Sequence, residues 1–437
     1  EGVPLPRYGF DQQKDAYTIP FLLRNSEPEK LDKTRFYRMT HEQDLYDNYE
    51  KKIQGLNSLV GKIRNEEYSD DIYVVDPNDF LSIGRQPFLY WFGDSILNLF
   101  SQYPAIEESV EIKQGLATGD DDRFVRKHWE VPPAELESDY TPYQKSGSSS
   151  PYYDTQRDYL YWKDDGKEVK EYDGSYPRNP DYYFREGISF RGFGNYAVAR
   201  EKPDDTIFYH KSHFVYSPEI NDQYLLGYGN STLVRFLLNG INPSLNFEVG
   251  DVKRLPIESE PEQQQKVENL VNRARERRKK LVALDETSDE FSPEVFANHV
   301  QGGVRELLHY EDRLNAEVGL IHGLIDPIIY DEYSIPTEER NRLYNNLPKN
   351  LSTYPVVENL EADYDILNDD VPKEDMSPDE YEDLLSTIVE SPVEIRDAAE
   401  ELEISPLTIA DARYREDLYE AERLEQAAGR VLSFCLG

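Results

Sequence analysis

The residues with the clearest capacity for chemistry lie in one short stretch, residues 111–130, with the sequence EIKQGLATGDDDRFVRKHWE. Its alternating start predicts a strand that runs into a loop containing Gly115 and Gly119. Glycines at both ends of a loop permit tight backbone geometry, and Thr118 between them supplies a compact hydroxyl. The stretch therefore predicts a structured loop that presents side chains at a surface.

Three cations and two aromatic side chains follow this loop: Arg123, Arg126, Lys127, Phe124 and Trp129. Arginines beside aromatic rings make a surface that can hold phosphates and stack on bases. Taken alone, the segment more readily indicates a surface loop in which aspartates satisfy the arginines. A nucleic-acid role here therefore depends on what flanks the segment.

A second basic run, RARERRKK at residues 273–280, lies in a predicted helix at residues 262–284. Its arginines are Arg273, Arg275, Arg277 and Arg278. Two interpretations stand for this local reversal of charge: a solvated helix face, or a helix that contacts phosphates.

The chain as a whole is strongly acidic, with 48 basic and 86 acidic residues among 437 and a net charge of −38. The excess is spread along the sequence, and arginine outnumbers lysine, 28 to 20. An acidic partner-binding protein and a protein adapted to high salt both fit, and the even distribution favours adaptation to salt. The acidity therefore argues only weakly against DNA binding.

The single cysteine, Cys435, excludes a disulfide framework and a cysteine-based zinc site. No apolar run approaches membrane-spanning length and no secretory signal is present, so we expect a cytoplasmic protein with no membrane partner. The chain begins at Glu1 and ends in the apolar stretch VLSFCLG, and we expect it to be a piece of a longer protein.

The elements that position these residues are predicted from hydrophobic periodicity and turn signals. Strands are predicted at residues 71–80, 159–162, 186–200 and 206–217, with a further strand and polar turn closing residues 242–257. Helices are predicted at residues 44–63, 83–104, around 225–238, at 262–284 and within 299–333. A polar, acidic linker is predicted at residues 334–377.

Residues 139–184 are crowded with tyrosine, glycine and serine, and we expect short strands separated by turns. Aromatics that alternate with arginine and lysine suit nucleic-acid recognition, because rings stack on bases and guanidiniums read base edges. An irregular β domain with exposed tyrosines fits the same composition.

Residues 391–417 resemble a helix-turn-helix, with Ser405 as the N-cap of the second helix, Pro406 at its first position and Arg413 within it. A plain helical hairpin has the same pattern, so DNA contact here stays open.

The motifs of a complete methyltransferase are missing. A glycine-rich cofactor loop after a strand and an Asn/Asp/Ser-Pro-Pro-aromatic loop are both absent, since the one Pro-Pro pair follows Val131. No phosphate-binding P-loop, HExxH or GxSxG motif occurs. His210 and His213, three apart, indicate a strand surface and not a metal site.

Several stretches, in order, resemble the non-catalytic half of PglX-type adenine-specific DNA methyltransferases of the phage-defence systems called BREX. The resemblance covers most of residues 36–330. The stretches are FYRMTHEQDL, GRQPFLYWFGDSI, GLATGDDDRFVRKHWEV, RNPDYYFREGISF, YLLGYGNSTLVRFLLNGINPSLNFEVGDVKRLPI and LNAEVGLIHGL.

The resemblance implies a target-recognition region that reads DNA, preceded in the family by a methyltransferase domain that binds S-adenosyl-L-methionine. It implies no catalytic residue, metal or bound cofactor in this chain. The family usually has asparagine where Asp121 stands, which puts an amide contact there in question. The residues expected to contact DNA are Thr118, Arg123, Arg126, Lys127, Tyr182, Asn246, Lys253, Arg254, Arg273, Arg275, Arg277 and Arg278.

We therefore expect an α+β fold, with a mixed β-rich target-recognition domain followed by a helical region. The expected divisions are a linker and helical segment at 1–105, the target-recognition domain at 106–258, a helical spacer at 259–333, and an acidic linker with a helical C-terminal segment at 334–437. The expected partners are double-stranded DNA, a methyltransferase catalytic domain in cis or trans, and other subunits of the defence system. The alternatives are a catalytically inactive truncated paralogue that acts as a protein-interaction module, and a gene remnant without function.

Overall fold

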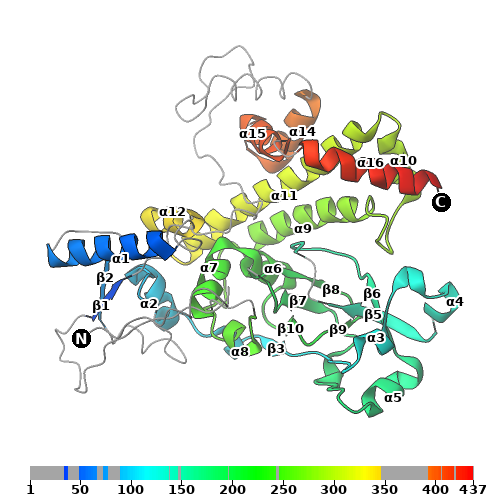
Figure 1. The fold of residues 1–437 in the computed structure, drawn as a ribbon, viewed down its shortest axis with the longest axis horizontal. Helices are drawn as coiled ribbons and strands as arrows, with labels where there is room; N and C mark the ends of the chain where they lie inside the picture. Colours follow the sequence, from blue (N-terminus) through cyan, green and yellow to red (C-terminus); the bar gives the residue numbers. More distant parts are fainter. Residues whose placement is uncertain are drawn as a thin grey trace. The chain divides into compact units, whose positions relative to one another are not determined.

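The computed structural model describes residues 34–37, 49–65, 72–76, 89–136, 138–145, 149–194, 196–242, 246–345, 392–404, 406–417 and 420–436. The chain divides into two compact units, Glu1–Tyr103 and Pro104–Gly437. The architecture is α+β, as the sequence predicts (Figure 1).

The first unit contains a two-stranded antiparallel sheet and two helices. The strands are β1 (Thr34–Tyr37) and β2 (Ile72–Val75), and the helices are α1 (Tyr49–Arg64) and α2 (Asp94–Gln102). The predicted strand within 71–80 and the predicted helices within 44–63 and 83–104 are confirmed over these ranges. Ile96, Leu97 and Leu99 are buried on one side of α2, because apolar residues at this spacing share a helix face.

The second unit begins with two small sheets. The first has the order β3-β10-β7-β8 and is antiparallel throughout, with strands β3 (Glu111–Lys113), β7 (Gly187–Arg191), β8 (Ala199–Lys202) and β10 (Ser212–Tyr216). The second has the order β4-β6-β5-β9, with strands β4 (Val125–Lys127), β5 (Tyr140–Gln144), β6 (Asp158–Tyr161) and β9 (Ile207–Phe208). Only β5 and β9 pair in parallel in this sheet.

The two sheets share one hydrophobic core, in which Leu116, Tyr143, Phe208 and Phe214 are fully buried. Short helical segments connect the strands: η3 (Ile106–Glu108), α3 (Asp121–Phe124), η4 (His128–Glu130), α4 (Pro133–Leu136), α5 (Lys163–Glu171) and η5 (Pro180–Tyr182). The expectation of strands and turns alone in residues 139–184 is wrong at α5. Three left-handed residues, Asp164, Asp165 and Gly166, lie in its first half.

The helical part of the second unit follows the sheets. Its helices are α6 (Asp222–Asn230), α7 (Thr232–Ile241), α8 (Val249–Val252), α9 (Gln264–Val282), α10 (Pro293–Val300), α11 (Val304–Glu332), α12 (Thr337–Asn345), α14 (Pro392–Leu402), α15 (Pro406–Asp417) and α16 (Glu420–Leu436). Figure 1 shows α9 and α11 side by side, and the two helices pack closely. The helices predicted at 262–284 and within 299–333 are confirmed, as are the two helices within 391–417. The expected N-cap of the second of these, Ser405, lies outside the described residues.

Three predictions of local structure in this part are wrong. The acidic linker expected at residues 334–377 is helical over α12, at residues 337–345. The helix around residues 225–238 is two helices, because the Ser231 side chain accepts a hydrogen bond from the backbone N–H of Val234 and so begins a new helix. The strand closing residues 242–257 is instead the short helix α8, flanked by isolated bridges at Asn246 and Pro256. The Asp251 carboxylate accepts from the backbone N–H of Glu248, 2.9 Å away, and this local bond favours a helical turn.

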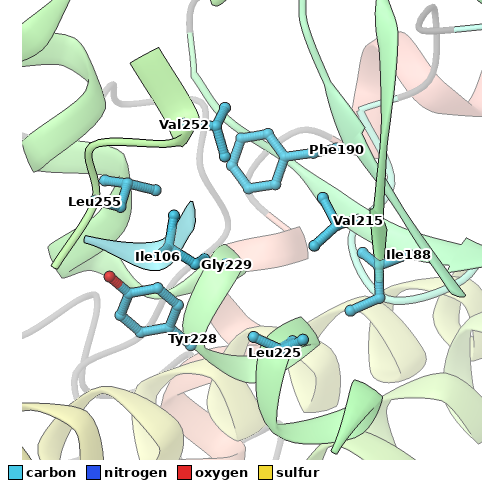
Figure 2. A pocket seen from close by; sticks show the side chains of 9 residues that line it. All are labelled: Ile106, Ile188, Phe190, Val215, Leu225, Tyr228, Gly229, Val252 and Leu255. Carbon is cyan, nitrogen blue, oxygen red and sulfur yellow. The ribbon is translucent and has the colours of Figure 1, made fainter. Parts of the chain in front are cut away.

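A small apolar cavity of about 20 Å³ remains inside the second unit. Figure 2 shows its lining side chains, among them Ile188, Phe190, Val215 and Val252. The phenol of Tyr228 donates its hydrogen bond to the carbonyl of Pro256, so the lining offers little to a polar ligand. The cavity is therefore a packing void.

Within the described ranges, no helix combines the length and the apolar character needed to cross a lipid bilayer.

Candidate nucleic-acid interface

The loop at residues 115–119 lies against two other segments of backbone, and both of its glycines are required there. A Cβ on Gly115 would lie 1.9 Å from the carbonyl oxygen of Phe208. Gly119 has a φ of +76°, and a Cβ there would lie 2.6 Å from the carbonyl oxygen of Gly174. The tight geometry expected from the sequence is confirmed, because only glycine permits both approaches.

Thr118 is buried at the centre of this loop and its hydroxyl is used inside the protein. The hydroxyl donates to one carboxylate oxygen of Asp121, and the other oxygen is 2.7 Å from the ammonium of Lys145. Burial raises the pKa of Asp121, but the hydrogen bonds from Lys145 and Thr118 outweigh it and leave that pKa below its ordinary value. The network holds the carboxylate ionised and ties the loop to Lys145, directly after β5.

The three cations after the loop have different partners. Arg123 lies 2.7 Å from the carboxylate of Glu168, with its guanidinium over the ring of Tyr172 at 5.3 Å. Lys127 pairs with Asp158 across the β4–β6 ladder at 2.9 Å. The expectation that aspartates satisfy the arginines is therefore wrong for Arg123, which pairs with a glutamate.

Arg126 is the exception, because its Nη1 donates to backbone carbonyls. The acceptors are the carbonyls of Asp122, at 2.6 Å, and Val125, at 2.7 Å. Within the part of the chain that the structure describes, no carboxylate lies within ion-pair distance of Arg126.

Three other candidate residues lie around α8 and are engaged locally. Lys253 pairs with Glu107 at 3.1 Å, and Arg254 pairs with Asp251 at the end of α8. The backbone carbonyl of Asn246 accepts from the Asn242 side chain at 2.7 Å.

The basic run of α9 links helices within the second unit. Arg277 is only 7% exposed, and its guanidinium lies 2.9 Å from Glu317 on α11 and 2.6 Å from Glu401 on α14. Arg273 donates to the backbone carbonyl of Glu401. Burial lowers the pKa of Arg277, but Glu401 and Glu317 outweigh it and raise that pKa above its ordinary value.

The other two arginines of α9 reach the β-rich part. Arg275 binds the carboxylate of Glu201 on β8, with Nε donating at 3.0 Å, and Arg278 donates to the hydroxyl of Ser150. A solvated helix face is therefore wrong for the four arginines. Phosphate contact by α9 stays a prediction and would require these internal bonds to be exchanged.

The predicted helix-turn-helix pair, α14 and α15, packs on α11. Arg413 of α15 is buried, with its guanidinium 3.8 Å from both Glu317 and Glu394. This arginine therefore faces other helices of the unit.

The expectation of a histidine pair on a strand surface is wrong for His213. Its side chain is fully buried, and Nε2 lies 2.7 Å from the carbonyl oxygen of Phe247. Burial lowers the pKa of His213, so the neutral ring is favoured. Among the described residues, no group of three or more histidine, cysteine or acidic side chains lies in a metal-binding arrangement.

Sequence reasoning named Tyr182 but missed the arginines on either side of it, Arg178 and Arg185, both exposed. The Arg185 guanidinium lies 4.9 Å from the centre of the Tyr182 ring, and the Tyr182 hydroxyl donates to Glu111. The signal available was the spacing of arginine and tyrosine in RNPDYYFR, at residues 178–185.

Comparison with known proteins finds no family model that matches the chain. The adenine-specific methyltransferase BrxX of Escherichia coli O9:H4 (strain HS) is 26% identical over 328 residues, which cover 70% of this chain and 26% of that protein. The adenine-specific methyltransferase PglX of Lacticaseibacillus casei (strain Zhang) is 25% identical over 258 residues, which cover 53% of this chain and 21% of that protein. The chain spans about a quarter of the length of these curated relatives. These matches support the resemblance to BrxX- and PglX-type adenine-specific methyltransferases.

Proposed function

We propose that this chain is the target-recognition and DNA-binding part of a site-specific N6-adenine DNA methyltransferase of a phage-defence or restriction–modification system. The observation that carries the proposal is the similarity to two adenine-specific methyltransferases over as much as 70% of the chain but only about a quarter of their length. A methyltransferase domain, in cis or in trans, would supply catalysis.

S-adenosyl-L-methionine is assigned to that other domain, because the glycine-containing sequence GFGNYA, at residues 192–197, is a poor match to a cofactor loop. A Cβ on Gly192 would lie 2.8 Å from the His213 ring and 3.1 Å from the carbonyl of Phe247. The backbone of Phe193 pairs with that of Asn246. At Gly192 this loop is thus packed against its own protein and leaves no room beside the backbone.

In this proposal the β-rich part of the second unit meets double-stranded DNA in the cytoplasm. Arg126 is the strongest of the predicted contacts after the 115–119 loop, because its guanidinium is held by neutral carbonyls. Among the described residues, it has no carboxylate to exchange for a phosphate. Arg123 would exchange Glu168 for a phosphate, which costs little because that ion pair is half exposed.

Equilibrium binding of the full chain to duplex DNA across a range of salt concentrations tests the proposal. We expect an affinity that falls as salt rises, and that falls about tenfold further with Arg126→Ala, in keeping with one specific contact. Arg340→Ala is the matched control, because Arg340 pairs with Asp331 on the helical side at 2.6 Å. An absence of DNA binding at every salt concentration, with the chain folded, would remove the proposal.

The rival proposal is a truncated paralogue that binds other defence subunits. Purification of the chain from its native cells separates the two, since stable protein partners without DNA affinity would favour the rival. Methyl transfer by this chain alone would contradict both.

A further inference from the structure

The segment at residues 176–185, YPRNPDYYFR, here called the arginine–tyrosine loop, runs along the strand and loop at residues 111–117. Its first residue, Tyr176, exchanges two backbone hydrogen bonds with Ala117, at 2.8 and 3.1 Å. The Asn179 side chain donates to the carbonyl of Gln114 at 2.8 Å, and the Tyr182 hydroxyl donates to Glu111. The loop is therefore fixed at three points, one on the edge strand β3 and two on the segment that follows it.

Neutral groups hold the two arginines of this loop. Arg178 donates to the amide oxygen of Gln114 at 2.7 Å, and its guanidinium lies 5.5 Å from the centre of the Tyr176 ring. The Arg185 guanidinium lies over the ring of Tyr182. Within the described part of the chain, no carboxylate is within ion-pair distance of either arginine. In a chain of net charge −38, two exposed arginines held in this way are positions suited to an external anion.

Aromatic rings of the same loop are open to solvent, with Tyr176 58% and Phe184 42% exposed. Phe184 also has a φ of +57°, a left-handed conformation that is unfavourable for a bulky side chain. Such strain persists only where the surrounding structure holds it, and it concentrates at ligand-contacting segments. Exposed rings beside arginines can stack on bases or wedge into a groove.

The 115–119 loop braces the arginine–tyrosine loop. The Gly119 backbone lies against that of Gly174, two residues before Tyr176, and the distance from a Cβ at Gly119 to the Gly174 carbonyl oxygen would be only 2.6 Å. Gln114 holds both Arg178 and the Asn179 side chain. Gln114 and Gly119 therefore position the arginine–tyrosine loop, which carries Arg178 and Arg185.

We propose that the arginine–tyrosine loop is a DNA-contacting element, in which Arg178 and Arg185 bind backbone phosphates and Tyr176 and Phe184 contact sugars or bases. The proposal rests on the proposed function and adds a site for it. Gln114 and Gly119 are positioning residues for this element.

The test uses the full chain, a labelled duplex DNA oligonucleotide and the double variant Arg178→Ala/Arg185→Ala. We expect the double variant to bind about tenfold more weakly or worse, and the slope of log affinity against log salt to become shallower by about 0.9 for each phosphate that is no longer bound. Arg340→Ala removes one arginine from the helical side and is expected to change neither quantity. Tyr176→Ala is expected to weaken binding without changing the salt slope.

Outcomes for the loop and for the proposed function are distinguishable. DNA binding by the unsubstituted chain together with equal affinity and salt slope in the double variant would overturn this inference alone. No binding by the unsubstituted chain would overturn both. The unfolding midpoint of each variant checks that it is folded. If the double variant is unfolded, Arg185→Gln is used in its place. This substitution breaks no ion pair within the described part of the chain, because the Arg185 guanidinium lies against the Tyr182 ring. Unchanged DNA affinity with loss of a co-purifying protein would instead identify a protein-docking loop.

Discussion

Arg277 and Glu317 form a buried ion pair between α9 and α11, with 2.9 Å between Nε and Oε2 and less than a tenth of either side chain exposed. Glu401 of α14 forms a second ion pair with the same guanidinium, with 2.6 Å between Arg277 Nη2 and Glu401 Oε2. One side chain thus joins three helices, and the helix pair α14–α15 is attached to the rest of the unit partly through it.

Replacement of Arg277 by alanine is expected to lower the free energy of unfolding by about 1.5–3 kcal/mol, because Glu317 would lose its hydrogen-bonded cation and keep only the longer contacts with Arg413 and Arg313. Urea unfolding followed by circular dichroism measures the change. Lys280→Ala, at an exposed position of the same helix, is the control and is expected to change stability by less than about 0.5 kcal/mol. Equal stability of the two variants would contradict a structural role for the pair.

Replacement of Gly119 by alanine is expected to destabilise the protein by about 1–3 kcal/mol, because the residue is left-handed and its Cβ would meet the backbone of Gly174. Gly429 on α16 provides the matched substitution, since a Cβ there meets nothing within 4 Å. Gly429→Ala is expected to stabilise the helix by about 0.5–1 kcal/mol. Thermal unfolding of the two variants should therefore shift in opposite directions, and a neutral Gly119→Ala would show that the loop can move away.

Asp326 gives the stability a specific dependence on pH. Burial raises its pKa to about 6, against opposing hydrogen bonds from Thr232 and the charge of Arg235. Because the folded-state pKa lies above the ordinary 3.8, the folded state favours the protonated form. The stabilisation from this group is complete below the unfolded-state pKa and is lost as pH rises through about 6.

Asp326→Asn should remove that dependence. The free energy of unfolding of the unsubstituted chain, minus that of the variant, is expected to fall as pH rises from about 4 to about 6 and to stay level above that range. Urea unfolding at a series of pH values measures this difference. A difference that does not change with pH would mean that the Asp326 carboxyl has the same pKa in the folded and unfolded states.

Much of the local structure follows from the sequence alone. Apolar spacing predicted α9, α11 and the α14–α15 pair, because one face of each helix must be buried whatever its neighbour is. The glycines at 115 and 119 predicted a tight loop, because few other residues adopt its geometry. The sequence did not predict the helix break at Ser231. A serine within an apolar run caps a helix only when its side chain hydrogen-bonds to the backbone, and the sequence pattern does not show whether it does.

The partners of the charged side chains were decided only by the tertiary structure. The run RARERRKK predicts a basic surface, but Arg275 and Arg277 meet Glu201, Glu317 and Glu401, which lie 74, 40 and 124 residues away in the sequence. Local pattern carries no information about such distant carboxylates. The same reason applies to Arg178, because only the fold places the neutral side chain of Gln114 beside it. Thus the sequence determined most of the helices and the tight loop at residues 115–119, while packing decided which arginines are bound internally and which face outward.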